Sequence, residues 1–271
     1  MISKANAMLR EFDQANFDLI CENRGASCYY KETRVKYEQK PNSAEYFHNY
    51  YTKEIVGFDP LTTLFFELNT DVIDTNTDYY KVIKQESTPD TLLIFYEAKT
   101  KKVLMIQPRV TLVLRFVRYI NEHSVLDIQI SAEVMGLQDH PEVKEHFEKA
   151  GDQLASIHLV ASRLRGMGPL TVKYSAAKMD VHSSVGLALT RPFISSNQKK
   201  YSSKVPQEID DFYKQKKYLD GRNVIWFNDD YEKLFNRYTE QSSLTEAAGV
   251  TVDQRSELQV APEVQAAPNS V

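Results

Sequence analysis

The most regular hydrophobic pattern in the chain lies between residues 141 and 165. Apolar residues recur there at alternating steps of four and three, the spacing of one face of an α-helix; they are Val143, Phe147, Ala150, Leu154, Ile157, Ala161 and Leu164. Pro141 suits the first turn, and Gly166 followed by Gly168-Pro169 can end a helix. The pattern therefore predicts one long helix over 141–165.

Short runs of alternating apolar and polar residues lie on both sides of this predicted helix. Such runs, separated by turn residues, predict antiparallel strands, here at 16–21, 27–37, 79–85, 91–98, 102–107, 110–120, 126–130, 170–175, 179–190 and 224–227. The fold class that follows is α+β, an antiparallel sheet with the helix 141–165 packed across one face.

Shorter helices are expected to flank this core. Apolar residues at helical spacing, with Ser, Asp or Asn available as N-caps, predict helices over 2–13, 43–54, 60–68, 206–213 and 228–238. Residues 1–75 are expected to form a mixed helical and hairpin region, either part of the core domain or separate from it, and 76–241 to form the α+β core domain. Residues 242–271 contain no aromatic residue and predict a disordered tail.

The composition is that of a soluble globular protein, with 42% hydrophobic and 26% charged residues. The longest apolar stretch, 103–120, is interrupted by Gln107, Arg109, Arg115 and Arg118, so we expect no membrane span and no membrane partner. The two cysteines, Cys21 and Cys28, and the absence of a signal-peptide pattern at the start indicate a cytoplasmic protein.

Two stretches combine basic side chains with tyrosines, the combination that single-stranded nucleic acids require for phosphate pairing and base stacking. Their residues are Tyr29, Tyr30, Lys31, Arg34, Lys36 and Tyr37 in the first, and Lys199, Lys200, Tyr201, Lys204, Lys216 and Lys217 in the second. The first functional hypothesis is therefore a non-enzymatic accessory protein that binds single-stranded nucleic acid, although the net charge of −4 does not demand such a partner.

Two alternative functions stay open. The 16 tyrosines and 13 phenylalanines would suit a self-associating structural subunit, or one that binds a protein partner through its tail or as a homo-oligomer. An enzyme would have to use His140, Glu142, His146 and His158, of which Glu142 and His146 share a helix face. No motif specific to a cofactor, a metal or a catalytic nucleophile is present, so we expect no cofactor, no metal site and no catalytic residue.

Overall fold

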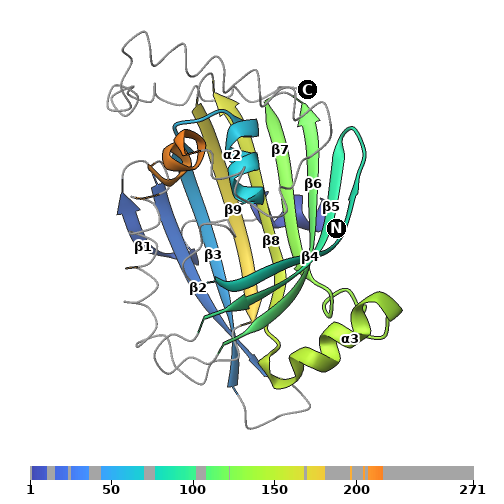
Figure 1. The fold of residues 1–271 in the computed structure, drawn as a ribbon. Coiled ribbons are helices and arrows are strands. Elements are labelled where there is room, and N and C mark those ends of the chain that lie inside the picture. Colours follow the sequence, from blue (N-terminus) through green and yellow to red (C-terminus); the bar gives the residue numbers. More distant parts are fainter. Residues whose placement is uncertain are drawn as a thin grey trace, which may run out of the picture.

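The computed structural model describes residues 2–10, 16–23, 26–36, 44–69, 77–101, 108–121, 123–167, 170–180, 196, 204 and 207–215. These residues form a nine-stranded antiparallel sheet with helices on both of its faces (Figure 1). The strands are β1 (Asp18–Asn23), β2 (Ala26–Lys36), β3 (Ala44–Val56), β4 (Thr77–Ser87), β5 (Thr91–Thr100), β6 (Val110–Asn121), β7 (Ser124–Ser131), β8 (Ser156–Met167) and β9 (Leu170–Asp180).

The strand order across the sheet is β1-β2-β3-β9-β8-β7-β6-β5-β4. Each run of consecutive strands, β1 to β3 and β4 to β9, is a meander, and β3 joins the two runs by pairing with β9. The connection from β3 to β4 contains the helix α2 (Pro60–Leu68). The sheet curls, so that β4 and β5 sweep across the front of the middle strands and α2 lies within the curl (Figure 1).

We call the face against which α2 packs the inner face. Asp59 caps α2 by accepting hydrogen bonds from the backbone nitrogens of Leu61 and Thr62, at 2.9 and 3.0 Å, and Pro60 occupies its first turn. Phe65 and Phe66 of α2 pack against Phe212, which belongs to a helical segment over 207–214. The largest hydrophobic cluster among the described residues therefore lies between the inner face, α2 and this segment.

The opposite face, which we call the outer face, carries the two remaining helices, α1 (Ile2–Arg10) and α3 (Pro141–Ala150). Ala5 of α1 is buried against Leu126, Ile128 and Ala161, while Val143 of α3 belongs to a separate cluster near β5 and β6. The strands β5 to β8 therefore alternate between two hydrophobic layers, as a sheet covered on both faces requires.

The predicted long helix over 141–165 is wrong, and so is the fold class built on it. The helix α3 ends at Ala150, followed by a 3-10 turn (η3, Gly151–Gln153) whose Gly151 has a φ of 48°. The remainder enters the sheet as β8, between β7 and β9. Ala161 packs on the outer face and Leu164 on the inner face, so the predicted stripe is divided between opposite sides of a strand.

The predicted helix over 43–54 is also wrong, because this segment lies in β3. Its aromatic residues, Tyr46, Phe47, Tyr50 and Tyr51, are strand formers, and the segment pairs with β2 on one side and β9 on the other. The described part of the chain is therefore mainly a large antiparallel sheet with short helices beside it. The predicted fold, a sheet with one long central helix, is not observed there.

Other predicted elements are confirmed. The structure contains α1 near the start, the hairpin β1-β2, the helix α2, the strands β4 to β7, and helical residues over 207–214. The two strands predicted over 170–175 and 179–190 are not separate, because β9 runs without a break from Leu170 to Asp180. The rest of the second prediction, 181–190, and the predictions for 102–107, 224–227, 228–238 and the tail 242–271 lie outside the described residues. The domain boundaries near 75 and 241 stay predictions, although β3 shares its sheet with β9.

Candidate functional site

The inner face changes character with distance from α2. Next to the helix it is apolar and fully enclosed, with Leu92, Ile94 and Val117 at 0% exposure. Farther along the same face, Tyr80 and Gln129 are only partly buried. The inner face therefore has an enclosed end under α2 and a less enclosed end beyond it.

A buried ion pair, Arg115 with Asp127, lies between these two ends. Arg115 Nε donates to Asp127 Oδ1 at 3.0 Å and its Nη2 donates to Oδ2 at 2.7 Å, while the two residues are 6% and 2% exposed. Burial alone would lower the pKa of Arg115, but the Asp127 charge and these hydrogen bonds raise it above its ordinary value. The guanidinium is therefore held charged and fixed in direction.

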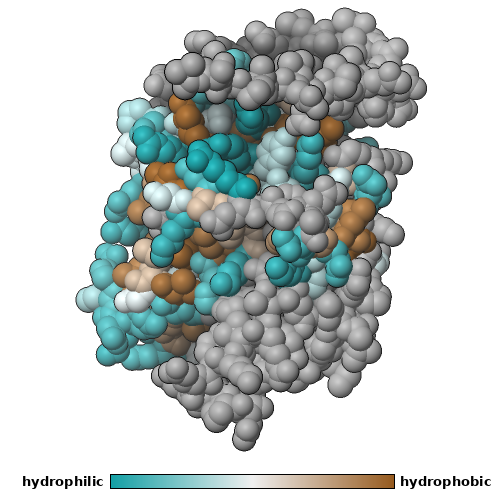
Figure 2. Space-filling view, turned by 180° about the vertical axis from the view of Figure 1, so that it is seen from behind, coloured by the Kyte–Doolittle hydropathy of each residue, from teal (hydrophilic) through white to brown (hydrophobic). Residues whose placement is uncertain are grey.

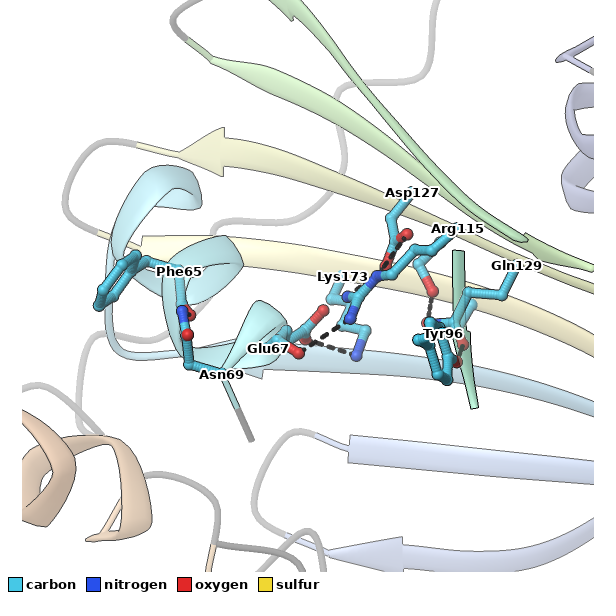
Figure 3. A network of polar contacts seen from close by, with 10 residues as sticks. Phe65, Glu67, Asn69, Tyr96, Arg115, Asp127, Gln129 and Lys173 are labelled. Carbon is cyan, nitrogen blue, oxygen red and sulfur yellow. Dashed lines mark hydrogen bonds and ion pairs between the residues drawn. The ribbon is translucent and has the colours of Figure 1, made fainter. Parts of the chain in front are cut away.

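A second ion pair connects α2 to the sheet. Lys173 Nζ of β9 donates to Glu67 Oε1 of α2 at 2.6 Å, and Arg115 Nη1 donates to the backbone oxygen of Glu67 at 3.0 Å (Figure 3). Both side chains of the Lys173-Glu67 pair are 13% exposed. Two cations and two carboxylates thus compensate one another, so this group of side chains is neutral in sum.

Neutral polar side chains surround the two ion pairs. Tyr96 Oη donates to Gln129 Oε1 at 3.0 Å beside the Arg115-Asp127 pair (Figure 3). Ser162 of β8 lies opposite Asp127 of β7 and is hydrogen-bonded to Ser175 of β9 at 2.8 Å. We call these residues, Glu67, Tyr96, Arg115, Asp127, Gln129, Ser162, Lys173 and Ser175, the inner polar cluster.

The inner polar cluster is suited to binding rather than to acid-base or nucleophilic chemistry. Its carboxylates are each paired with a cation, and its serines are bonded to one another rather than to a histidine or another base. Within the described ranges, no three His, Cys, Asp or Glu side chains gather where they could hold a metal ion. The arrangement offers fixed hydrogen-bonding groups beside an apolar wall, which is typical of a ligand site.

The four residues proposed for an enzyme do not form one site. His140 caps α3 through the backbone nitrogen of Glu142 at 3.4 Å, and Glu142 pairs with Lys84 at 3.5 Å. His146 instead contacts Glu97 of β5 at 2.6 Å, and His158 lies in β8. The predicted grouping is wrong because three of these residues hold α3 and its surroundings together in separate contacts.

The first predicted nucleic-acid stretch lies in β2. Tyr30 is 1% exposed, so it is part of the core and cannot stack on a base, while Lys31 lies over the ring of Phe17, 5.8 Å from its centroid. Tyr29 is partly buried and packs near Tyr51, and Arg34 and Lys36 also belong to β2. Tyr37 lies outside the described residues.

The second predicted stretch lies largely beyond the part of the chain that the structure describes. Lys204 is described and exposed, whereas Lys199, Lys200, Tyr201, Lys216 and Lys217 lie outside. The structure therefore does not bring the two stretches together in one described surface.

Comparison with known proteins identifies the fold. No protein-family model matches the chain, and no curated protein sequence matches it. Among solved structures, the chain is similar to human STARD10, with a TM-score of 0.60 and 12% identity over 84% of this chain and 86% of that one. It is also similar to human StAR-related lipid transfer protein 5, with a TM-score of 0.53 and 13% identity over 78% of this chain and 97% of that one.

This similarity shows that the chain has the fold of StAR-related lipid transfer proteins. The prediction of single-stranded nucleic-acid binding is wrong, because the fold is that of lipid transfer proteins and Tyr30 of the first predicted stretch is buried in the core. The prediction of a self-associating or protein-binding subunit loses its basis for a different reason. Tyrosines that appeared to be in surplus, among them Tyr30, Tyr51 and Tyr96, are buried inside the molecule. No helix within the described ranges is both long and apolar enough to cross a bilayer.

Sequence reasoning missed the inner polar cluster. Arg115 stands within the apolar run of β6, and Asp127 stands between Leu126 and Ile128 in β7. Each strand of this hairpin therefore has a charged residue among apolar ones. This pattern can be recognised in a sequence, because the pairing of the two strands places these two charged residues on the same face of the sheet. In the sequence, Arg115 was interpreted only as a charge that rules out a membrane span, and its pairing with Asp127 was not considered.

Proposed function

We propose that the chain binds a lipid or another hydrophobic molecule on the inner face of its sheet. The observation that carries this proposal is the inner face itself, where an apolar wall meets a buried and charge-balanced polar cluster. The similarity of the fold to StAR-related lipid transfer protein 5 supports the same conclusion. The ligand lies beyond α2, along Tyr80, Val82, Ala98 and Gln129, which are only partly buried.

The two parts of the site have different roles. The hydrocarbon part of the ligand packs against the apolar side chains, where each Å² removed from water contributes about 25 cal/mol. The polar part of the ligand meets Tyr96, Gln129 and the Arg115-Asp127 pair. Because the ion pairs compensate one another, this end favours a group that forms hydrogen bonds without carrying a large net charge.

A vesicle extraction assay tests the proposal. The purified chain is incubated with vesicles of phosphatidylcholine, phosphatidylethanolamine, cholesterol and ceramide, the vesicles are sedimented, and the lipid retained by the protein is identified by mass spectrometry. We expect one of these lipids to be retained in stoichiometric amount. A supernatant protein free of lipid, with all four lipids left in the pellet, would contradict the proposal.

A paired substitution tests the inner polar cluster within the same assay. The variant Arg115→Met with Asp127→Leu removes both charges together, so it avoids leaving one charge buried alone and is expected to fold. We expect it to retain several-fold less of the preferred lipid. The control variant Lys144→Met with Glu148→Leu removes an exposed pair 4.0 Å apart on α3 and should retain as much lipid as the parent chain.

We also propose that the protein acts in the cytoplasm. The low cysteine count supports this, because only Cys21 and Cys28 are present and no disulfide framework can be built from them. Mass spectrometry of alkylated protein isolated from cells should find both thiols reduced. A disulfide between them in the isolated protein would contradict a reducing location.

A further inference from the structure

A pocket lies on the outer face, on the opposite side of the sheet from the inner polar cluster. It has a volume of about 410 Å³ and is lined by Ile2, Asn6, Asp90, Arg118, Tyr119, Ile120 and Leu126. These residues come from α1, the β4-β5 turn, the end of β6 and the start of β7. Figure 2 views the molecule from behind, where hydrophilic and hydrophobic side chains adjoin one another over the described surface.

Two arginines lie in one cross-strand row that passes through this pocket, and Arg118 is the one that lines it. Arg118 of β6 is opposite Leu126 of β7, and Leu126 is opposite Arg163 of β8. Directly opposed residues on antiparallel strands have Cβ atoms about 5 Å apart and on the same face. Leu126 therefore forms an apolar floor with an arginine residue on either side of it in the neighbouring strands.

Arg163 fixes the orientation of the Asn6 amide. Its Nη2 donates to Asn6 Oδ1 at 2.9 Å, so the amide oxygen of Asn6 faces the arginine. The other end of the amide is an NH2 group, which can only donate. Arg163 Nε is buried without a hydrogen-bond partner within the described residues, so this corner of the molecule has more donors than acceptors.

Arg118 also has donors to spare. Its single ion-pair contact in the described part of the chain is with Asp90 Oδ2 at 3.9 Å, which is beyond hydrogen-bonding distance. The other oxygen of Asp90 accepts hydrogen bonds from the hydroxyls of Thr88 and Thr91, each at 3.1 Å. The Arg118 side chain is 47% exposed, so a ligand can reach its guanidinium.

We infer that this pocket binds a small molecule that carries one carboxylate on a short hydrocarbon chain. Arg118 and the NH2 group of Asn6 supply donors for the carboxylate oxygens, and Ile2, Ile120 and Leu126 contact the hydrocarbon. Asp90 offsets part of the Arg118 charge, so the pocket accommodates one negative charge better than the two of a phosphate monoester. The site is separate from the inner face and does not depend on the lipid proposal.

Calorimetric titration with octanoate tests this inference, with three matched comparisons. The variant Arg118→Gln removes the guanidinium from the pocket. The control Arg165→Gln removes an equal charge from an exposed residue two positions beyond Arg163 on the same strand. The third comparison replaces octanoate with octanol, which keeps the chain and lacks the charge.

We expect Arg118→Gln to weaken octanoate binding roughly tenfold or more, as the loss of a charge-assisted hydrogen bond implies. Arg165→Gln should change it less than about twofold, and octanol should bind far more weakly. Lipid extraction by the Arg118→Gln variant should equal that of the parent chain, which separates this site from the inner face. Equal weakening by both substitutions, equal binding of octanol, or no octanoate binding would each overturn the inference.

Discussion

At the scale of single residues, the polar groups buried in the two layers have different roles. Arg115 and Asp127 are diagonal neighbours across the β6-β7 hairpin, where Arg115 is opposite Gln129 and Asp127 is opposite Val117. Removing only one of them would leave an unpaired charge in the core, at a cost of about 3 to 5 kcal/mol. Such a pair is costly to place beneath an apolar helix, which supports the proposal that the inner polar cluster binds a ligand.

In the outer layer, Glu97 is the buried carboxylate to compare with this ion pair. It is 4% exposed and contacts Tyr79 and His146, so it links β4, β5 and α3. Burial alone would raise the pKa of Glu97, but the hydrogen bonds from Tyr79 and His146 and the charge of Lys149 lower it below its ordinary value of 4.5. Burial and the same carboxylate raise the pKa of Tyr79 to about 12.

These contacts predict how stability depends on pH. A carboxyl group with a lowered folded pKa stabilises the fold above its unfolded pKa, and this contribution disappears as the pH falls through the folded value. Glu97→Gln should therefore flatten the loss of stability below about pH 4.5, measured as urea midpoints from pH 6 to pH 3. The control Glu148→Gln, at an exposed position on α3, should follow the parent curve. Parallel curves for Glu97→Gln and the parent would contradict this assignment.

At the scale of elements, the boundary between α3 and β8 depends on one glycine. Gly151 has a φ of 48°, a conformation that other residues rarely adopt, and an added Cβ would meet no atom within 4 Å. Gly151→Ala should therefore destabilise the protein by about 1 to 2 kcal/mol through backbone strain alone. Gly57 also has open space around it but no positive φ, so Gly57→Ala should change the free energy of unfolding by less than about 1 kcal/mol in either direction. Equal effects of the two substitutions in urea unfolding would show that strain at Gly151 is not what matters.

The same boundary shows what local sequence patterns can predict. Hairpins with clear turn residues, such as β1-β2, and helices with a clear cap, such as α2, were predicted because the determining interactions lie within a few residues. The prediction from the stripe Val143 to Leu164 was wrong because apolar residues spaced by four and then three positions fit one face of a helix. In β8, residues of this stripe lie on two opposite faces of a strand. Only the pairing of β8 with β7 and β9 distinguishes these cases, and that pairing is not a local property.

The aromatic segment in β3 was assigned wrongly for the same reason. Its pairing partners are β2, which is close in sequence, and β9, whose residues Thr171 to Asp180 are far along the chain. The candidate site was equally hard to predict, because the inner polar cluster joins Glu67 of α2, Arg115 of β6 and Lys173 of β9. These residues share a site only after the sheet has curled around α2.

At the scale of the whole molecule, the two proposed binding sites lie on opposite faces of one sheet. The inner face combines an enclosed apolar end, a neutral polar cluster and a less enclosed end, which together suit an amphipathic ligand. The outer face is covered by α1 and α3, and its pocket under α1 suits a much smaller anionic molecule. Binding on the two faces is therefore expected to be independent.

Photochemical labelling tests the central claim most directly. The chain is incubated with phosphatidylcholine vesicles containing a sterol and a phosphatidylcholine that each carry a diazirine in the hydrocarbon part; after irradiation and removal of the vesicles, the labelled peptides are mapped. The account predicts labels on inner-face positions beyond α2, such as Tyr80, Ala98 and Gln129, and fewer labels when unlabelled lipid competes. Labels confined to the outer face, around Phe95, Leu126 and Ala161, would contradict it.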